Sequence, residues 1–309
     1  MSSNAHVPVL LGPVLEGLDI KADGLYVDGT FGRGGHSAAI LKALDASGRL
    51  IAIDRDPQAV ASASTLLTDD PRFEVVGSEF AQLATIIGER GQSGKVNGLL
   101  LDLGVSSPQL DEAERGFSFL RNGPLDMRMD PDSGIAAAEW LQTVKERDLK
   151  SIIRKFGEER HAARIARAIV TKRENSTIET TGQLAEIVSS VVPTHTRKRH
   201  PATKTFQAIR LFINNELGQL EAVLAQSMDV LQLGGRLCVI SFHSLEDRIV
   251  KRFMRDASRE AEQYRGMPEV PEEFRPKLAL IGKLVSATAE EIQANVRARS
   301  ARLRIAERL

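Results

Sequence analysis

A glycine-rich loop between a short apolar run and a helical segment is the feature that most constrains this chain. The run Leu25–Val27 leads into residues 28–36, which hold four glycines, and the segment Ser37–Leu44 follows at once. Glycine lets a backbone turn tightly and lets a ligand approach it closely. A strand, a glycine loop and a helix N-terminus together predict an α/β domain that binds a nucleotide-like ligand.

A second apolar run supports this interpretation because it ends in an acid, Asp54, 19 residues after Gly35. In nucleotide-binding α/β folds, an acid at about that distance binds ribose hydroxyls. The loop departs from Gly-x-Gly-x-x-Gly, because Ser37 stands where the third glycine belongs. The sequence therefore favours an adenosine cofactor other than a dinucleotide, and the alternative is a tight turn beside a surface acid.

Composition limits the classes to which the chain can belong. Its 309 residues are 42% hydrophobic and 27% charged, which is ordinary for a soluble globular protein. The formal net charge is zero, so affinity for a polyanion has to come from a local patch. The single cysteine, Cys238, excludes a disulfide within the chain and lies in an apolar run, which predicts a core position. No stretch reads as a membrane span or signal peptide, so we expect a cytoplasmic protein.

Strand and helix signals alternate in the first third of the chain. Such alternation predicts βαβ units and a parallel sheet. The expected strands are Leu25–Asp28, Leu50–Asp54, Phe73–Val76 and Val96–Leu103, and the expected helices are Ser37–Leu44, Pro57–Leu67 and Phe80–Gly88.

After Asp102 this rhythm stops, and residues 136–192 have a helical pattern with dense charge pairs. We expect a helical insert at 111–204 between two parts of the α/β domain, 1–110 and 205–309. The apolar spacing predicts one long helix over 205–231, stopped by Gly234 and Gly235. The sheet should resume at 236–242, and the tail should add a strand at 278–281, a helix at 289–298 and a strand at 301–305.

Two further segments follow expected strands and are candidate site segments. Asp102 ends an apolar run and leads into Ser106–Gln109, and ligands of open α/β sheets bind beyond the carboxyl ends of the strands. His243 follows the run 236–240 and could contact a substrate base or phosphate. The alternative for His243, which we favour from the residues alone, is a capping role for a helix that begins near Ser244, with Asp247 at the capping-box offset.

A basic segment at 194–204 contains no acid, in a chain without net charge. It predicts a surface that contacts nucleic-acid phosphates, and the alternative is a solvated loop between helices. Its candidate nucleic-acid contacts, which are RNA contacts if the resemblance described below holds, are Arg197, Lys198, Arg199, His200 and Lys204. We expect no metal site, because the histidines are scattered and the acids at 126–132 lack EF-hand spacing.

Taken in order, nine segments resemble the MraW/RsmH family of S-adenosylmethionine-dependent methyltransferases. That family acts on the N4 amine of a cytidine in small-subunit (16S) ribosomal RNA. The segments span nearly the whole chain and are 6–10, 28–36, 52–57, 102–111, 115–119, 123–130, 203–210, 214–217 and 241–248.

The resemblance implies an α/β class I (Rossmann-like) methyltransferase sheet interrupted by a helical substrate domain. S-adenosyl-L-methionine would be the cofactor and 16S rRNA, within the small ribosomal subunit, the partner. The implied cofactor-binding residues are Gly34, Gly35, His36, Asp54, Phe80, Asp102 and Gln109. A second copy of the chain could pack on the exposed face of the expected helix at 205–231.

A cytosine amine is a weak nucleophile, so methyl transfer to it is chiefly a matter of alignment and of acceptors for the amine protons. Many amino-methyltransferases use an Asn/Asp/Ser-Pro-Pro-aromatic loop, but the loop here lacks the second proline and the aromatic residue. Our candidates for holding the base are Ser106, Ser107, Pro108, Asp126 and His243. Two other functions stay open at this point: a nicotinamide-dependent oxidoreductase, and a non-catalytic RNA-binding protein of ribosome assembly.

Overall fold

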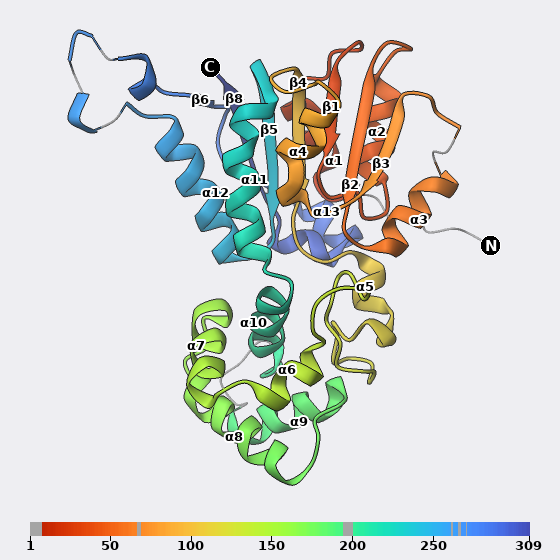
Figure 1. Cartoon of the computed structure of the whole chain (residues 1–309), viewed down its shortest axis with the longest axis vertical. Helices are drawn as coiled ribbons and strands as arrows, with labels where there is room; N and C mark the ends of the chain where they lie inside the picture. The colour runs from red at the N-terminus through yellow and green to blue at the C-terminus, as the bar shows by residue number, and fades with distance from the viewer. Residues whose placement is uncertain (1–7, 67–68, 194–199, 261, 265–266, 270) are drawn as a thin grey trace. The chain divides into compact units, whose positions relative to one another are not determined.

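The computed structural model describes residues 8–66, 69–193, 200–260, 262–264, 267–269 and 271–309. The chain folds into two compact units, drawn in Figure 1. Unit 1 comprises Met1–Gly104 and Gly218–Leu309, and unit 2 comprises Val105–Leu217. A helical unit is thus inserted into an α/β unit, with boundaries at 104/105 and 217/218 instead of the expected 110/111 and 204/205.

Unit 1 contains one sheet with strand order β3-β2-β1-β4-β5-β8-β6, and β7 pairs with β8. The strands from β3 to β5 are parallel to their neighbours, whereas β8 is antiparallel to β5. This order is that of a Rossmann-like sheet, as the sequence predicts. The strands are β1 (Leu25–Asp28), β2 (Arg49–Asp54), β3 (Phe73–Gly77), β4 (Val96–Asp102), β5 (Leu231–Ser241), β6 (Leu278–Leu280), β7 (Val285–Ser286) and β8 (Arg302–Arg308).

Helices cover both faces of the sheet, because successive strand residues point to opposite sides. Leu99 and Leu101 of β4 share a core cluster with residues of α4 (Leu83–Glu89), α11 (Glu216–Val230) and α12 (Ser244–Ala257). Leu100, between them, packs with residues of α1 (Leu11–Leu18) and α2 (Gly35–Ala43) on the other face. Cys238 lies fully buried in this second cluster, as predicted. The remaining elements of unit 1 are α3 (Pro57–Leu66), α13 (Ala289–Ala294) and the 3-10 helices Phe80–Gln82, Glu262–Tyr264, Glu272–Phe274 and Val296–Ser300.

The described part of unit 2 is helical apart from one isolated bridge between Pro124 and Thr180. Its core is built on Trp140, Ile153, Ile165 and Phe206, all of which are buried. Its helices are α5 (Ser107–Asp111), α6 (Ala137–Thr143), α7 (Glu146–Gly157), α8 (Ala162–Asn175), α9 (Thr181–Val191), α10 (Thr203–Ile213) and the 3-10 helix Ala113–Arg115.

The single helix predicted over 205–231 is wrong, because the chain breaks it into α10 and α11 at Asn214 and Asn215. Asn215 has φ 48°, a left-handed conformation that asparagine tolerates better than most residues. The apolar stripe of the sequence runs through both helices. Phe206 and Ile209 are buried in the core of unit 2, whereas Leu220 and Leu224 are buried in the core of unit 1. Pairing of this segment with a second copy stays a prediction.

The strand β5 also begins earlier than predicted, at Leu231 instead of residue 236. Its pairing with β4 is irregular, since Val96 faces Leu231 and Gly98 faces Arg236. Gly234 lies in this irregular stretch with φ 77°. The glycines therefore form a bulge inside the strand, where the sequence analysis placed the end of a helix.

Candidate functional site

Three acids of unit 1 end three neighbouring parallel strands. Asp28 ends β1, Asp54 ends β2 and Asp102 ends β4. Strand β1 lies between the other two, so all three carboxyl ends reach the same edge of the sheet. This edge is where open α/β sheets bind ligands, and the chain changes its direction of winding there, between β1 and β4.

Asp102 carries a buried carboxyl oxygen without a partner. Its Oδ1 has no hydrogen-bond donor among the described residues, although buried polar atoms are nearly always satisfied. Burial, together with the nearby acids Asp28 and Glu246, raises the pKa of Asp102 to about 8. The backbone N–H of Asp102 donates to Thr30 Oγ1 at 2.6 Å, which fixes the end of β4 against the glycine loop. An orphaned, easily protonated carboxyl at a strand end is the mark of a ligand site.

His36 lies beside this carboxyl, with Nδ1 3.6 Å from Asp102 Oδ2. Its other nitrogen, Nε2, is 3.1 Å from the carbonyl oxygen of Val9 and is well placed to donate its proton there. Burial lowers the pKa of His36, so the ring is neutral near pH 7. Since Asp102 is also largely protonated at that pH, the contact is one between neutral groups and not a salt bridge.

Asp54 fastens the glycine loop to the end of β2. Its Oδ2 accepts from the N–H of Gly32 at 2.7 Å, and its Oδ1 accepts from the N–H of Asp56 at 2.8 Å. Burial raises the pKa of Asp54 to about 6, despite these two hydrogen bonds. Asp54 is therefore ionised at neutral pH and has lone pairs left for a ligand hydroxyl.

The glycine loop needs glycine at two of the positions named from the sequence. Gly34 has φ 71°, and a Cβ there would lie 2.5 Å from the ring of Phe31. A Cβ on Gly35, the first residue of α2, would lie 2.4 Å from Pro8. Phe80 follows β3 as the first residue of a 3-10 helix and packs half-buried against the core. These residues lie in the same unit as the three acids.

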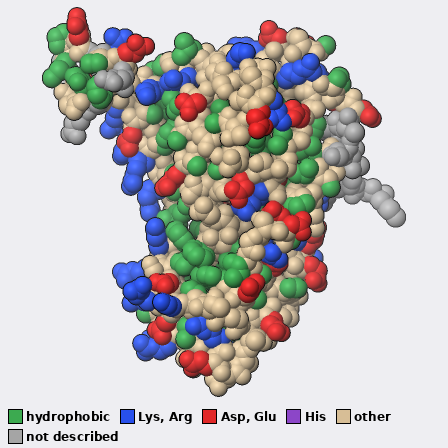
Figure 2. Space-filling model, in the orientation of Figure 1, with side chains coloured by type: hydrophobic (Ala, Val, Ile, Leu, Met, Phe, Trp, Pro, Cys, Tyr) green, Lys and Arg blue, Asp and Glu red, His purple; other side chains and the backbone are tan. Residues whose placement is uncertain are grey.

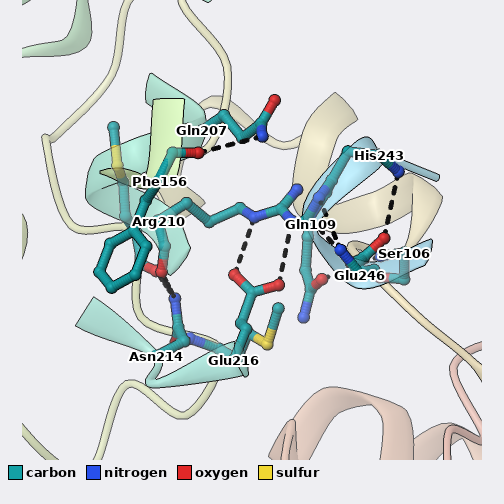
Figure 3. A network of polar contacts seen from close by, with 11 residues as sticks. Ser106, Gln109, Phe156, Gln207, Arg210, Asn214, Glu216, His243 and Glu246 are labelled. Atoms are coloured by element: carbon teal, nitrogen blue, oxygen red, sulfur yellow. Dashed lines mark hydrogen bonds and ion pairs between the residues drawn. The ribbon is translucent and has the colours of Figure 1, made fainter. Parts of the chain in front are cut away.

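His243 is the N-cap of α12, as the favoured alternative predicts, but its capping partner is Glu246 and not Asp247. The helix begins at Ser244, as expected, but its capping box joins residues 243 and 246 instead of residues 244 and 247. The buried carboxylate of Glu246 accepts from the N–H groups of Phe242 and His243, at 2.8 and 3.2 Å. His243 Nε2 lies 3.0 Å from Glu246 Oε1, at an angle too poor for a hydrogen bond. Figure 3 shows this pair at the start of the helix.

Ser106 and Gln109 of unit 2 form a capping box at the start of α5 (Figure 3). The side-chain oxygen of Gln109 accepts from the N–H of Ser106 at 2.9 Å, and Gln109 is buried. Ser107 and Pro108 are the first two residues of this helix and are half-buried. Residues 106–109 thus stabilise the start of α5, and contact with a ligand stays a prediction for them.

Asp126, a further candidate of unit 2, is held by Arg128 through two hydrogen bonds of 2.8 Å. Burial raises the pKa of Asp126, but the hydrogen bonds from Arg128 outweigh burial, and the pKa falls below its usual value. The side chain of Asn214 holds the loop that contains Asp126. It accepts from the N–H of Met129 at 2.8 Å and donates to the carbonyl oxygen of Met127 at 2.7 Å. Figure 3 shows Asn214 beside the bidentate pair of Arg210 and Glu216.

Of the expected RNA contacts, Arg197, Lys198 and Arg199 lie outside the described residues. The other two lie in unit 2. His200 stacks on Phe119 with ring centroids 4.5 Å apart, and Lys204 is exposed with its ammonium 2.7 Å from the carbonyl oxygen of Glu158. The aromatic neighbour of His200 comes from a segment 81 residues away, so the local sequence contains no sign of it.

Thr30 and Glu246 belong to the site but are missing from the candidates named from the sequence. Thr30 joins β4 to the loop, and Glu246 places a buried carboxylate near Asp102. The capping-box spacing from His243 would have identified Glu246, whereas nothing in the local sequence points to the contact of Thr30.

The acids of unit 1 fit a cationic ligand. Burial raises the pKa values of Asp28, Asp54 and Asp102, and repulsion by the charge of Asp28 adds to the rise at Asp54 and Asp102. A positively charged group would relieve this repulsion, whereas the pyrophosphate of a dinucleotide would add to it. S-adenosylmethionine carries a sulfonium and an ammonium charge beside an adenosine, so the three carboxyl groups suit it.

In the part of the chain that the structure describes, no three His, Cys, Asp or Glu side chains form a metal-binding group, and no helix is long and apolar enough to cross a membrane.

Solved structures give distant likenesses to this chain. A candidate rRNA methylase of Clostridium thermocellum is 13% identical, with a TM-score of 0.46 over 98% of this chain and 100% of that one. An rRNA methylase of Streptococcus thermophilus is 12% identical, with a TM-score of 0.41 over 99% of each chain. A SAM-dependent methyltransferase of Aquifex aeolicus is 10% identical, with a TM-score of 0.43 over 97% of this chain and 90% of that one.

The family comparison is far more specific than these likenesses. The model of the MraW methylase family matches residues 3–309, which is nearly the whole chain. The match covers residues of both units, and it assigns methyl transfer instead of hydride transfer, with S-adenosylmethionine as the donor. The chain belongs to the MraW methylase family.

Proposed function

We propose that this enzyme transfers a methyl group from S-adenosylmethionine to the N4 amine of a specific cytidine in the decoding region of 16S rRNA. The observation that carries the proposal is the family match over residues 3–309. The cluster of buried acids at the strand ends supports the cofactor, and the sequence resemblance supports the base and the RNA. The enzyme would act in the cytoplasm on RNA of the small ribosomal subunit.

The residues of unit 1 would hold the cofactor in complementary ways. Asp54 would accept from the ribose hydroxyls, and Asp102 would offer its unpartnered oxygen to a positively charged or N–H-bearing group. Gly34 and Gly35 would let the loop backbone approach the ligand, and Phe80 would stack on the adenine. His36 would hold Asp102 in place, and Gln109 of unit 2 would add a contact. When bound, S-adenosylmethionine supplies a methyl group already activated by its sulfonium.

The protein's part in the reaction is alignment of the amine and acceptance of its protons. The lone pair of a cytosine N4 is delocalised into the ring, so positive charge develops on the amine as it is methylated. Acceptors that face the amine stabilise this charge. Ser106, Ser107 and the carbonyl of Pro108 would provide them, with Asp126 and His243 as further candidates. No strong base is required, since the proton can leave after the transfer. Because the target lies in folded RNA, the cytosine has to leave its stack to react.

The test is transfer of labelled methyl groups from S-adenosylmethionine to small ribosomal subunits that lack the modification, followed by mass spectrometry of the nucleosides. Labelled N4-methylcytidine, or its 2′-O-methyl derivative, is the expected product. Label on another base would keep the methyltransferase and contradict its specificity. Tight RNA binding with intact cofactor binding and no label would favour the non-catalytic assembly role instead.

We expect the basic segment at 194–204 to contribute phosphate contacts. The triple variant Arg197→Ala, Lys198→Ala, Arg199→Ala should bind the RNA more weakly, and the slope of log affinity against log salt should fall by about 2, at about 0.7 per lost single-strand contact. Fluorescence anisotropy at several salt concentrations measures both. A control carrying Lys42→Ala, Lys95→Ala and Lys283→Ala, at exposed positions, removes the same charge elsewhere. An unchanged slope in the variant of residues 197–199 would contradict the assignment.

A further inference from the structure

Two aromatic rings from distant segments of unit 2 lie against each other at its surface. The ring of His200 stacks on that of Phe119, with centroids 4.5 Å apart and an angle of 29° between the planes. Phe119 in turn meets the buried ring of Phe206 edge-on, with centroids 4.9 Å apart, so the core of unit 2 holds it in place. His200 itself is exposed. Because Phe119 covers one face of the His200 ring, the exposed surface of that ring lies on its other face and its edges.

The backbone also fixes the orientation of the His200 ring. Nδ1 of His200 accepts from the N–H of Ala202 at 3.2 Å, and its carbonyl oxygen accepts from the N–H of Thr203 at 3.1 Å. With Nδ1 as an acceptor, the neutral ring carries its proton on Nε2. A surface side chain ordinarily loses rotamer freedom when a ligand covers it. A ring that is already fixed loses little, so His200 is preorganised for a planar partner.

The loop that follows Phe119 presents an exposed leucine beside this pair. Leu120 is 86% exposed, the largest value among the exposed large hydrophobic side chains of the described residues. The loop is anchored, since the side-chain oxygen of Asn122 accepts from the N–H of Gly182 at 2.9 Å. The hydroxyl of Thr181 accepts from the N–H of Gly123 at 3.2 Å. Leu120 therefore extends an exposed apolar surface on a backbone that is held in place.

Cations lie near His200, at the start of α10. Lys204 is exposed there. The end of α7 is close to it, because a Cβ on Gly157 would lie 2.5 Å from the carbonyl oxygen of Lys204. The last turn of α7 carries the exposed cations Arg154 and Lys155. In Figure 2, Lys and Arg side chains gather at the lower left, where Figure 1 places α7.

A single-stranded RNA combines the groups that such a surface would bind. An unpaired base is planar and stacks on aromatic rings, and its phosphates are attracted by cations. The basic segment at 194–204 contains no Phe, Tyr or Trp, so by itself it predicts only phosphate contacts. The structure adds Phe119 to that segment and so supplies the stacked surface that a base requires.

We propose that the stacked pair of Phe119 and His200, with Leu120 beside it, binds an unpaired base of the substrate RNA. This inference rests on the proposed function and changes the role expected of His200 from a phosphate contact to a stacking surface. Every base has a face that can stack, so the pair positions a nucleotide without selecting its identity. It contains none of the residues that would hold the cofactor, and it contributes to RNA binding alone.

Two substitutions of His200 distinguish stacking from a structural role. His200→Asn keeps an acceptor for the N–H of Ala202, as in an Asx turn, but removes the ring. His200→Tyr keeps a ring and removes that acceptor. We expect the Asn variant to bind a single-stranded 16S rRNA fragment about 5- to 150-fold more weakly, and the Tyr variant to stay within about twofold of the unaltered protein. Fluorescence anisotropy at several salt concentrations measures both, and the salt slope should not change, because stacking releases no counterions.

An exposed position gives a second test that does not depend on the start of α10. Leu120→Ser should bind the fragment about two- to tenfold more weakly, because the RNA no longer covers an apolar side chain. The matched control is Leu233→Ser, which removes a leucine that is 75% exposed in unit 1. The control should bind the RNA like the unaltered protein.

Three results would overturn the inference. One is unaltered affinity in His200→Asn with a loss in His200→Tyr, which would make His200 a structural cap. Another is an equal loss in both variants with a smaller salt slope, which would make His200 a phosphate contact. The third is unaltered affinity for RNA with weaker binding to whole small subunits, which would make the surface a contact for ribosomal protein. Failure of the proposed function would appear separately, as RNA binding without methyl transfer by the unaltered protein.

Discussion

Replacing Asp102 with asparagine is expected to stabilise the ligand-free protein and, at the same time, to weaken its binding of S-adenosylhomocysteine. The carboxyl of Asp102 has a pKa of about 8 in the folded protein, against 3.8 ordinarily, and burial is the main cause. In the unfolded chain the group ionises from about pH 4 upward, whereas in the folded chain it stays protonated until about pH 8. The carboxyl therefore costs folding free energy, and the cost grows between these two pH values.

The gain in stability should follow the same pH window. Asparagine keeps the shape of the side chain but does not ionise, so folding of the variant does not have to bury an ionisable carboxyl. We expect a gain on the order of 2 kcal/mol at pH 8, which discounts the full shift because the side chain of Asp102 is 26% exposed. The gain should shrink as the pH falls and vanish near pH 4. Urea unfolding at several pH values measures it.

Binding should weaken although the fold is stabilised, because we propose that the same carboxyl binds the ligand. The unpartnered Oδ1 should accept from the cofactor, and a hydrogen bond with a charged partner contributes about 1.5–3 kcal/mol. The dissociation constant for S-adenosylhomocysteine should therefore rise about 10- to 100-fold. Asp23→Asn, at an exposed position before β1, is the matched control. Lower stability together with wild-type affinity would assign Asp102 a structural role.

Much of the sheet edge that carries Asp28, Asp54 and Asp102 could be predicted from the sequence, because the sequence patterns that mark it are local. Strands β1, β2 and β4 are short apolar runs that end in acids, and the glycine loop lies directly after the first of them. The order of apolar and polar residues marks where such strands end, and parallel strands bring their carboxyl ends to one edge. Asp54 and Asp102 could be chosen on these grounds before the structure was known.

The break between α10 and α11 could not be predicted in this way. The apolar spacing continues through Asn214 and Asn215 as if one helix were present. What stabilises the break is a set of hydrogen bonds from Asn214 to Met129 and Met127, 85 and 87 residues away. The unpartnered oxygen of Asp102 is equally hidden in the sequence, because its burial depends on packing by several distant segments.

Replacing Asp54 with alanine is expected to have the second large effect, a loss of cofactor affinity on the order of 100-fold. The substitution removes the carboxylate that we propose accepts from the ribose hydroxyls. It also frees the N–H groups of Gly32 and Asp56, which the carboxylate now holds at 2.7 and 2.8 Å. Calorimetry with S-adenosylhomocysteine measures the loss, and an affinity equal to that of the unaltered protein would contradict the assignment.

The pH dependence of binding distinguishes the charge of Asp54 from its shape. Burial raises the pKa of Asp54 to about 6 in the folded protein, so the carboxylate that we propose as the hydroxyl acceptor becomes protonated as the pH falls through 6. Affinity for S-adenosylhomocysteine in the unaltered protein should therefore drop between pH 7 and pH 5. In Asp54→Asn, which keeps an acceptor but cannot titrate, affinity should be lower and nearly constant over this range. A parallel drop in both proteins would assign the titration to another group, and the raised pKa of Asp54 would then have no part in binding.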